Sequence, residues 1–159
     1  MTNPLKLARW LALLVPFGAL GGALAFQFWG GLYPCEMCWW QRYGHIAALA
    51  LALLSFALPA RRWPVALSAL ALGVAGLIGL YHAGVEYGWW LGLTACTSTV
   101  HFKGGDPVAE ILAAPLVRCD VVQWKLFGLS LAGYNFLLST AASAVIFALL
   151  AKVGGKAKG

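Results

Sequence analysis

Long apolar runs without a charged residue alternate with short polar segments along this chain of 159 residues. Three runs, at residues 10–29, 63–81 and 127–151, approach or exceed the roughly 20 residues that a helix needs to cross a bilayer. A fourth run, at residues 43–58, reaches that length only if residues 39–42 form the first turn of its helix. We count it as a span that carries one charged residue, Arg42, in its first turn. The pattern therefore predicts four transmembrane helices, at about residues 10–29, 39–58, 63–81 and 127–151.

The composition agrees with a chain that is mostly embedded in lipid. Apolar residues make up 62% of it and charged residues 10%, against roughly 25% charged residues in soluble domains. Because lipid offers the backbone no hydrogen-bond partners, spanning segments form helices, which satisfy their own amides. We predict an all-α fold, an integral membrane four-helix bundle in the lipid bilayer, with one domain over residues 1–159. A soluble enzyme, a disordered chain and a nucleic-acid-binding protein are poor interpretations.

The charged residues predict the orientation. With four spans, both termini and the turn at residues 59–62 lie on one side, which holds seven lysines and arginines and no acid. The other side holds four cations and all five acids. The positive-inside rule then places both termini in the cytoplasm. The net charge of +6 thus follows from the excess of cations on the cytoplasmic side. Seven of the eight tryptophans fall near span ends, where an interfacial aromatic belt is expected.

The first span also has features of a secretory signal. Lys6 and Arg9 precede the apolar run, and Ala23, Leu24 and Ala25 resemble a cleavage site. The run is longer than the roughly 7 to 15 residues of a signal core. We therefore expect the first helix to be retained.

Two loops lie on the outer side, at about residues 30–38 and 82–126. In the second, Asp106 and Pro107 form a good helix start, with an N-cap carboxylate and a proline at the first helical position. Pro115 would end that helix. Its apolar Val108, Ile111 and Leu112 share one face, which predicts a short helix lying along the membrane surface.

Small and polar residues inside the spans predict helix packing. The first span carries Pro16, Gly18, Gly21 and Gly22, and the third carries Gly73, Gly76 and Gly79. Small residues at this spacing let helix backbones approach closely, so we read both sets as ordinary packing positions. Asn135 and Ser139, one turn apart in the last span, are expected to hydrogen-bond between helices.

All four cysteines fall on the outer side: Cys35 and Cys38 in the first loop, Cys96 and Cys119 in the second. The orientation was obtained without them, yet it places every thiol where disulfides persist. Cys35 and Cys38 form a Cys-x-x-Cys motif, in which a reactive disulfide is more common than a structural one. The motif lies just before a helix, whose N-terminus favours a thiolate. Arg42 follows Cys38 by one turn and adds a positive charge on the same face.

Other uses of these residues remain open. Arg42 could extend to the lipid headgroups instead of serving a bound redox partner. A four-thiolate zinc site is disfavoured because Cys96 and Cys119 do not form a second Cys-x-x-Cys pair, and we expect no metal. A structural bridge between Cys96 and Cys119 would close a loop of about 24 residues and contribute roughly 3.5 kcal/mol. The sequence alone does not exclude that bridge.

Taken together, these features resemble the disulfide bond formation protein B (DsbB) family of bacterial inner-membrane enzymes. The resemblance rests on the four spans, on Gln41 and Arg42 after the Cys-x-x-Cys motif, and on the loop pair Cys96 and Cys119. It extends to a run that leads into the last span: Cys119, Asp120, Trp124, Phe127, Gly128, Leu129 and Ser130. The resemblance covers nearly the whole chain, and the combination is more specific than any single motif.

The resemblance implies a relay that reoxidises a periplasmic DsbA-like thiol oxidase and reduces quinone of the membrane pool. Oxidised Cys96 would form the mixed disulfide with that partner, and Cys119 would then reach Cys35. Cys38 would be released as a thiolate next to Arg42 and pass electrons to ubiquinone or menaquinone. His82 resembles in position a histidine that the family uses near the quinone ring; the alternative is a helix-end histidine with ordinary hydrogen bonds. Glu86, four residues on, is either its partner or solvated. The active cysteines would face the periplasm.

Several points do not follow from the sequence. Trp124 fits either the wall of a quinone pocket or the aromatic belt, and His45 fits either that pocket or a neighbouring helix. Glu36, between the two cysteines, should disfavour a thiolate there, so the redox potential cannot be inferred. The alternative function is a non-enzymatic membrane scaffold stapled by two periplasmic disulfides. The vitamin K epoxide reductase family shares the chemistry, but its Cys-x-x-Cys motif lies late in the chain.

Overall fold

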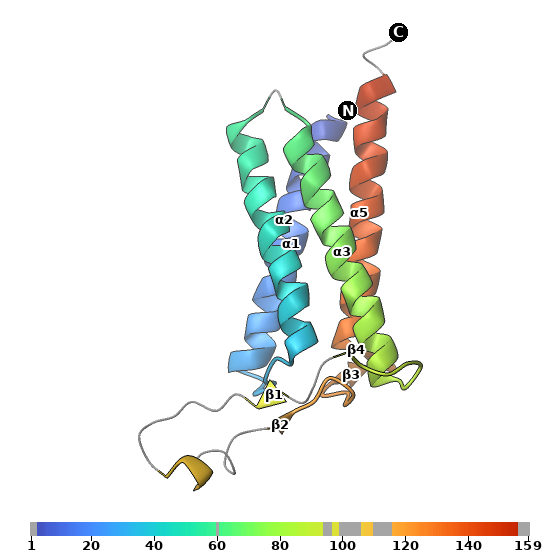
Figure 1. Ribbon diagram of the computed structural model, residues 1–159. Helices are drawn as coiled ribbons and strands as arrows, with labels where there is room; N and C mark the ends of the chain where they lie inside the picture. Colours follow the sequence, from blue (N-terminus) through green and yellow to red (C-terminus); the bar gives the residue numbers. More distant parts are fainter. Residues whose placement is uncertain (1–2, 60, 94–96, 99–105, 110–115, 156–159) are drawn as a thin grey trace.

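The computed structural model describes residues 3–59, 61–93, 97–98, 106–109 and 116–155. Within them, four long helices pack side by side as a bundle (Figure 1): α1 (Pro4–Phe28), α2 (Glu36–Ala57), α3 (Trp63–Glu86) and α5 (Leu131–Gly155). Helices α1, α3 and α5 are long and apolar enough to cross a membrane, which fits a multi-pass membrane protein. Helix α2 is not among them, because polar residues occupy its first half, and its membrane span stays a prediction.

Several helix boundaries differ from the sequence prediction. Helix α1 begins at Pro4, where the Asn3 side chain accepts a hydrogen bond from the Leu5 amide at 3.0 Å. Helix α3 continues to Glu86, five residues beyond the predicted end. The last helix begins at Leu131 rather than at residue 127. There, Phe127 and Gly128 have positive φ angles of 49° and 79°, and they form the turn of a hairpin instead of the first turn of the helix.

That hairpin pairs β3 (Lys125–Leu126) with β4 (Leu129–Ser130) in antiparallel register. A second antiparallel pair joins β1 (Thr97–Ser98) to β2 (Leu116–Val117), with Thr97 opposite Val117. Both pairs lie at the end of the bundle opposite to the start of α1 and the end of α5 (Figure 1). The β1–β2 pair joins the strand that follows Cys96 in the sequence to the strand that leads to Cys119.

The short helix predicted in the second loop is described only at its start. Residues 107–109 are helical, and the Val108 amide donates to the Asp106 side chain at 3.0 Å, so the predicted N-cap is confirmed. Ile111, Leu112 and Pro115 lie outside the described residues, as does Cys96.

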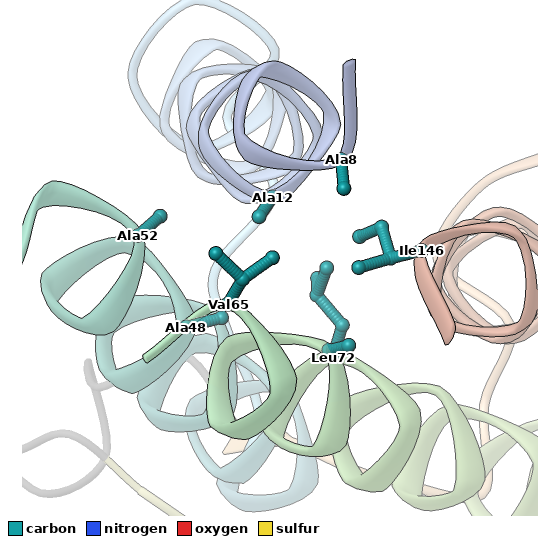
Figure 2. Packing of buried hydrophobic residues seen from close by; sticks show 8 residues of the cluster. Ala8, Ala12, Ala48, Ala52, Val65, Leu72 and Ile146 are labelled. Atoms are coloured by element: carbon teal, nitrogen blue, oxygen red, sulfur yellow. The ribbon is translucent and has the colours of Figure 1, made fainter. Parts of the chain in front are cut away.

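Small side chains form the core near the termini. Buried alanines of α1 (Ala8 and Ala12) and of α2 (Ala48 and Ala52) surround larger residues of α3 and α5, and Ala8 lies on the side of Ile146 (Figure 2). Those larger residues are Val65, Leu72 and Ile146, all fully buried. The alanines let α1 and α2 approach closely, as expected where lipid provides no hydrophobic drive between helices.

The glycines of α3 pack as predicted, whereas those of α1 do not. A Cβ at Gly79 would lie 2.9 Å from the Ala132 carbonyl oxygen of α5, and one at Gly76 would lie 2.7 Å from the Thr140 methyl group. At Gly18, Gly21 and Gly22 a Cβ would meet nothing within 4 Å. The prediction of close packing was therefore wrong for α1, whose glycine face borders an open space.

Candidate functional site

Cys35 is the N-cap residue of α2. Its extended backbone (φ −76°, ψ 177°) follows Pro34, which restrains the approach to the helix. The Cys35 Sγ accepts a hydrogen bond from the Cys38 amide at 3.3 Å and lies 2.9 Å from the Cys38 Sγ. The local fold therefore brings the two sulfurs together within the first turn, where the helix dipole favours a negative charge.

The long second loop folds back onto this turn. Cys119 and Val117 form a small buried cluster with Cys35, Met37 and Val85. The sulfurs of Cys35 and Cys119 and a ring nitrogen of His82 all lie within 4.8 Å of one another. Cys119 follows Cys35 by 84 positions, so this meeting is made by the tertiary fold.

The reduced pair is electrostatically unequal. The hydrogen bond between the two side chains and burial of the thiol both raise the pKa of Cys35 above its ordinary value. Cys35 therefore keeps its proton and can donate a hydrogen bond to the Cys38 sulfur. Negative charge is thus favoured on Cys38, the cysteine that lies deeper along α2.

His82 connects the cysteines to a polar network inside the bundle. Its Nε2 lies 3.5 Å from the Cys35 Sγ and 3.8 Å from a Glu86 carboxylate oxygen, and its Nδ1 lies 2.9 Å from the Gln41 amide nitrogen. The Asn135 amide group donates to the Gln41 Oε1 at 2.7 Å, and the Asn135 Oδ1 lies 2.8 Å from the His45 Nε2. The network thus joins α2, α3 and α5.

Arg42 is buried against α1 instead of extending toward headgroups. One guanidinium nitrogen donates to the Gln27 Oε1 at 2.5 Å, and another donates to the Ala23 carbonyl oxygen at 3.1 Å. The guanidinium carbon lies 5.0 Å from the centre of the Trp39 ring. Among the described residues no carboxylate lies within ion-pair distance of Arg42. Among the described residues, its positive charge therefore faces neutral oxygens, an aromatic ring and, when the pair is reduced, the sulfurs of Cys38 and Cys35.

A cavity of about 620 Å³ opens beside these residues. Apolar side chains of α1, such as Leu14 and Phe26, form one wall, and Tyr134 and Leu138 of α5 form another. Gly18 and Gly22 lie on this wall of α1, which explains the open space at those glycines. The wall formed by Cys35, α2 and α3 is its polar side, because all the described lining residues there are polar: Cys35, Cys38, Gln41, Arg42, His45, His82 and Glu86. Asn135 and Ser139 of α5 and Arg118 and Gln123 of the second loop also line the cavity. The shape suits a mostly apolar ligand with a small polar head.

The structure brings together five of the six predicted site residues. Cys35, Cys38, Arg42 and His82 line the cavity, and Cys119 lies beside Cys35 and His82. The sixth, Cys96, falls outside the described residues. Trp124 lines the cavity as well, and its ring lies 5.0 Å from that of Phe26. His45 both lines the cavity and contacts the neighbouring helix α5.

Sequence reasoning missed the part played by the amides. Asn135 bonds to α2 and α3, as expected for an interhelical residue, but Gln41 gave no signal beyond its place in the motif. The sequence prediction of no zinc site rests on the spacing of the cysteines alone. The structure brings together a different set of donor groups, two thiols and one imidazole. Among the described residues, the donor atoms of Cys35, Cys119 and His82 lie near enough to one another to bind a soft metal ion. The same short distance between the two sulfurs suits thiol–disulfide exchange.

Comparisons with known proteins agree with the geometry. The family model described as Disulfide bond formation protein DsbB matches residues 6–149. The chain is 32% identical to Disulfide bond formation protein B of Marinobacter nauticus, over 92% of this chain and 89% of that protein. It is 32% identical to the protein of the same name from Aromatoleum aromaticum, over 87% of each chain. No solved structure gives a significant match.

Proposed function

The chain belongs to the disulfide bond formation protein DsbB family, and from this premise we propose that it is a quinone-dependent thiol oxidase of the bacterial inner membrane. Membership in the family makes the chain a disulfide-generating oxidoreductase. The proposed substrate is the dithiol of a periplasmic DsbA-like protein, which becomes a disulfide while a membrane quinone becomes a quinol. Oxidation of two thiols releases two electrons and two protons, which is the amount that a quinone takes up.

One observation carries the proposal: the junction of Cys119 with Cys35 lies at the polar side of a largely apolar cavity. The sulfurs of Cys119 and Cys35 lie within 4.8 Å of each other, so electrons that arrive at Cys119 can pass to the Cys35–Cys38 pair. Cys38 and Arg42 line the cavity. A structural disulfide would need neither the buried cation nor the cavity. An arginine buried in a helical bundle without a carboxylate partner is costly, and such residues usually serve a ligand.

The residues around the cavity fit a quinone. The apolar walls of α1 and α5 would hold the isoprenoid side, and Arg42 would donate hydrogen bonds at the polar side, where Cys38 and His82 also lie. A bound quinone supplies the two-electron sink for the dithiol. The choice between ubiquinone and menaquinone depends on stacking and apolar fit.

The chain's own residues perform the exchange steps. A thiolate of the partner attacks Cys96 of the Cys96–Cys119 disulfide, which forms the mixed disulfide and releases Cys119 as a thiolate. The Cys119 thiolate then attacks the Cys35 sulfur. A Cys35–Cys119 bond forms, the Cys35–Cys38 bond breaks, and Cys38 leaves with the electron pair as a thiolate. The hydrogen bond from the Cys38 amide and the N-terminus of α2 orient this pair, and Arg42 provides the positive charge on the same face of the helix.

The test is quinone reduction by the purified protein in detergent, supplied with a reduced DsbA-like dithiol protein. We expect quinol formation that depends on this partner and is abolished in Cys38→Ser. In Arg42→Ala we expect a raised KM for quinone. Absence of turnover from folded, oxidised protein with several quinones and partners would contradict the proposal and favour a scaffold stapled by disulfides. In that case Cys35→Ala would impair folding instead of turnover.

A further inference from the structure

Two buried amides in the polar network have orientations that are fixed by backbone carbonyls. The Gln41 amide nitrogen donates to the Met37 carbonyl oxygen at 3.1 Å, and the Asn135 amide nitrogen donates to the Ala75 carbonyl oxygen at 3.0 Å. A carbonyl oxygen can only accept hydrogen bonds. Each amide must therefore present its nitrogen to its own carbonyl, and the Gln41 oxygen is left to accept from Asn135 at 2.7 Å.

The amide orientations settle the role of the His82 ring. The second N–H of the Gln41 amide points at the His82 Nδ1, 2.9 Å away. An atom that receives an N–H must offer a lone pair, so Nδ1 carries no proton. A neutral imidazole then carries its proton on Nε2. That N–H faces the Cys35 Sγ at 3.5 Å. In an imidazolium, Nδ1 would also carry a proton, and that N–H would point at the N–H of the Gln41 amide. Two donors that face each other in a buried site are unfavourable.

We propose that Gln41 and Asn135 are positioning residues that hold His82 as the neutral Nε2–H tautomer, so that it donates to sulfur where Cys35 and Cys119 exchange. The inference deepens the proposed function and rests on it. Cys119 carries negative charge when it attacks Cys35 and again when it leaves. A fixed donor in the buried pocket stabilises that charge without a proton transfer.

The surroundings of His82 agree with this tautomer. The titratable groups that face it are Cys35 before α2, Cys119 of the loop, and Glu86 on its own helix, whose oxygen lies 3.8 Å from the same Nε2. All of them accept a hydrogen bond in their ionised forms. Among the described residues, the Nε2 side of the ring thus faces groups that accept a hydrogen bond, the Cys119 backbone oxygen included, whereas Nδ1 faces the Gln41 N–H donor.

The tautomer can be read directly by long-range proton–nitrogen NMR of the full-length protein labelled with 15N-histidine, in detergent at neutral pH. His82→Gln identifies the His82 signals among the three histidines. We expect an unprotonated Nδ1 and a protonated Nε2. In Gln41→Glu, the carboxylate demands a donor, and we expect the proton to appear on Nδ1. Wild-type protein with a protonated Nδ1, or a Gln41→Glu spectrum unchanged from wild type, would overturn the proposal.

The consequence for exchange is tested with Gln41→Met, which keeps the side-chain length and removes the donor. We expect formation of the Cys35–Cys119 disulfide, trapped by acid and alkylation in a single turnover, to slow by roughly tenfold. Ser68→Ala is the matched control, because Ser68 is a fully buried hydroxyl that bonds to the Ala48 carbonyl oxygen elsewhere in the bundle. We expect Ser68→Ala to leave tautomer and rate unchanged. A wild-type exchange rate in Gln41→Met would contradict the proposed role.

The two proposals fail separately. The NMR signature requires no turnover, so the expected tautomer in a protein that reduces no quinone would support the positioning role and remove the proposed function. Quinone reduction by a protein whose His82 carries its proton on Nδ1 would support the proposed function and remove the positioning role.

Discussion

At the scale of single residues, the site depends on an asymmetry between two neighbouring thiols. Cys35 is 1% exposed and is surrounded by Met37, Val85 and the second loop, whereas Cys38, which also lines the cavity, is only partly buried. The pKa of Cys35 is raised by its hydrogen bond with Cys38 and by burial. As the pH rises through neutrality Cys35 therefore remains a thiol, and Cys38 is the first to ionise.

This asymmetry predicts the order of alkylation in the reduced protein. As pH is raised from mildly acidic to mildly alkaline values, we expect iodoacetamide to modify Cys38 before Cys35. Peptide mass spectrometry of samples quenched at each pH gives both extents. The same reaction in denatured protein is the control, where the two cysteines should react alike. Equal modification in the folded protein would show that the asymmetry is absent.

Arg42 provides a second prediction at this scale, because its two hydrogen bonds reach separate acceptors on α1. A lysine keeps the charge but has one ammonium group and cannot bridge Gln27 and Ala23 in the same way. In Arg42→Lys we expect a KM for quinone raised several-fold, with less change in turnover at saturation. Arg9→Lys serves as the control, since Arg9 donates to the Pro59 carbonyl oxygen at the other end of the bundle. An unchanged KM in Arg42→Lys would mean that charge alone suffices.

At the scale of helices, the same residue pattern serves two purposes. Glycines recur three or four residues apart in both α1 and α3, and the sequence predicts close packing for both. In α3 this is confirmed, because Gly76 and Gly79 contact α5. In α1 the glycines leave space, and two of them border the cavity. Spacing shows which residues share a face, but only the tertiary arrangement shows whether that face meets a helix.

Gly79→Ala is therefore expected to destabilise the protein. Its Cβ would lie 2.9 Å from a backbone oxygen of α5 and 3.0 Å from the Asn135 amide nitrogen, and neither can move freely. Overpacking of this kind costs about 1–3 kcal/mol. In thermal unfolding in detergent we expect a lower Tm. Gly21→Ala is the control; with nothing within 4 Å, it should be neutral or stabilising by up to about 1 kcal/mol.

The face of α1 at the cavity predicts the opposite behaviour. Gly18→Leu places a side chain into open space on the cavity wall, so we expect an unchanged or higher Tm together with a raised KM for quinone. Gly21→Leu is the matched control, because Gly21 lies on the same helix but does not line the cavity. Equal effects of the two changes on KM would show that the cavity is not the quinone site.

At the scale of the whole molecule, hydropathy and charge predict much of the architecture. Four helical segments and the placement of Cys35, Cys38 and Cys119 at one end of the bundle follow from apolar runs and from counting spans. The site itself could not be derived this way. Cys119 meets Cys35 through loop packing, and Gln41 acts through contacts with three helices, neither of which leaves a periodic signal. The hairpin at Phe127 and Gly128 was missed because apolar residues continue through it.

The four-span topology is the prediction that belongs to this scale, and its test centres on α2, because polar residues occupy the first half of that helix. Single cysteines can be placed in a cysteine-free background at Trp29, Arg61 and Leu91, all of which are exposed. In spheroplasts of a bacterial host, an impermeant maleimide should label the cysteines at positions 29 and 91, and label the one at 61 only after permeabilisation. If α2 did not cross, positions 29 and 61 would react alike. Labelling at 61 alone would reverse the orientation and place the native cysteines in the reducing cytoplasm, where the proposed disulfide relay would not be sustained.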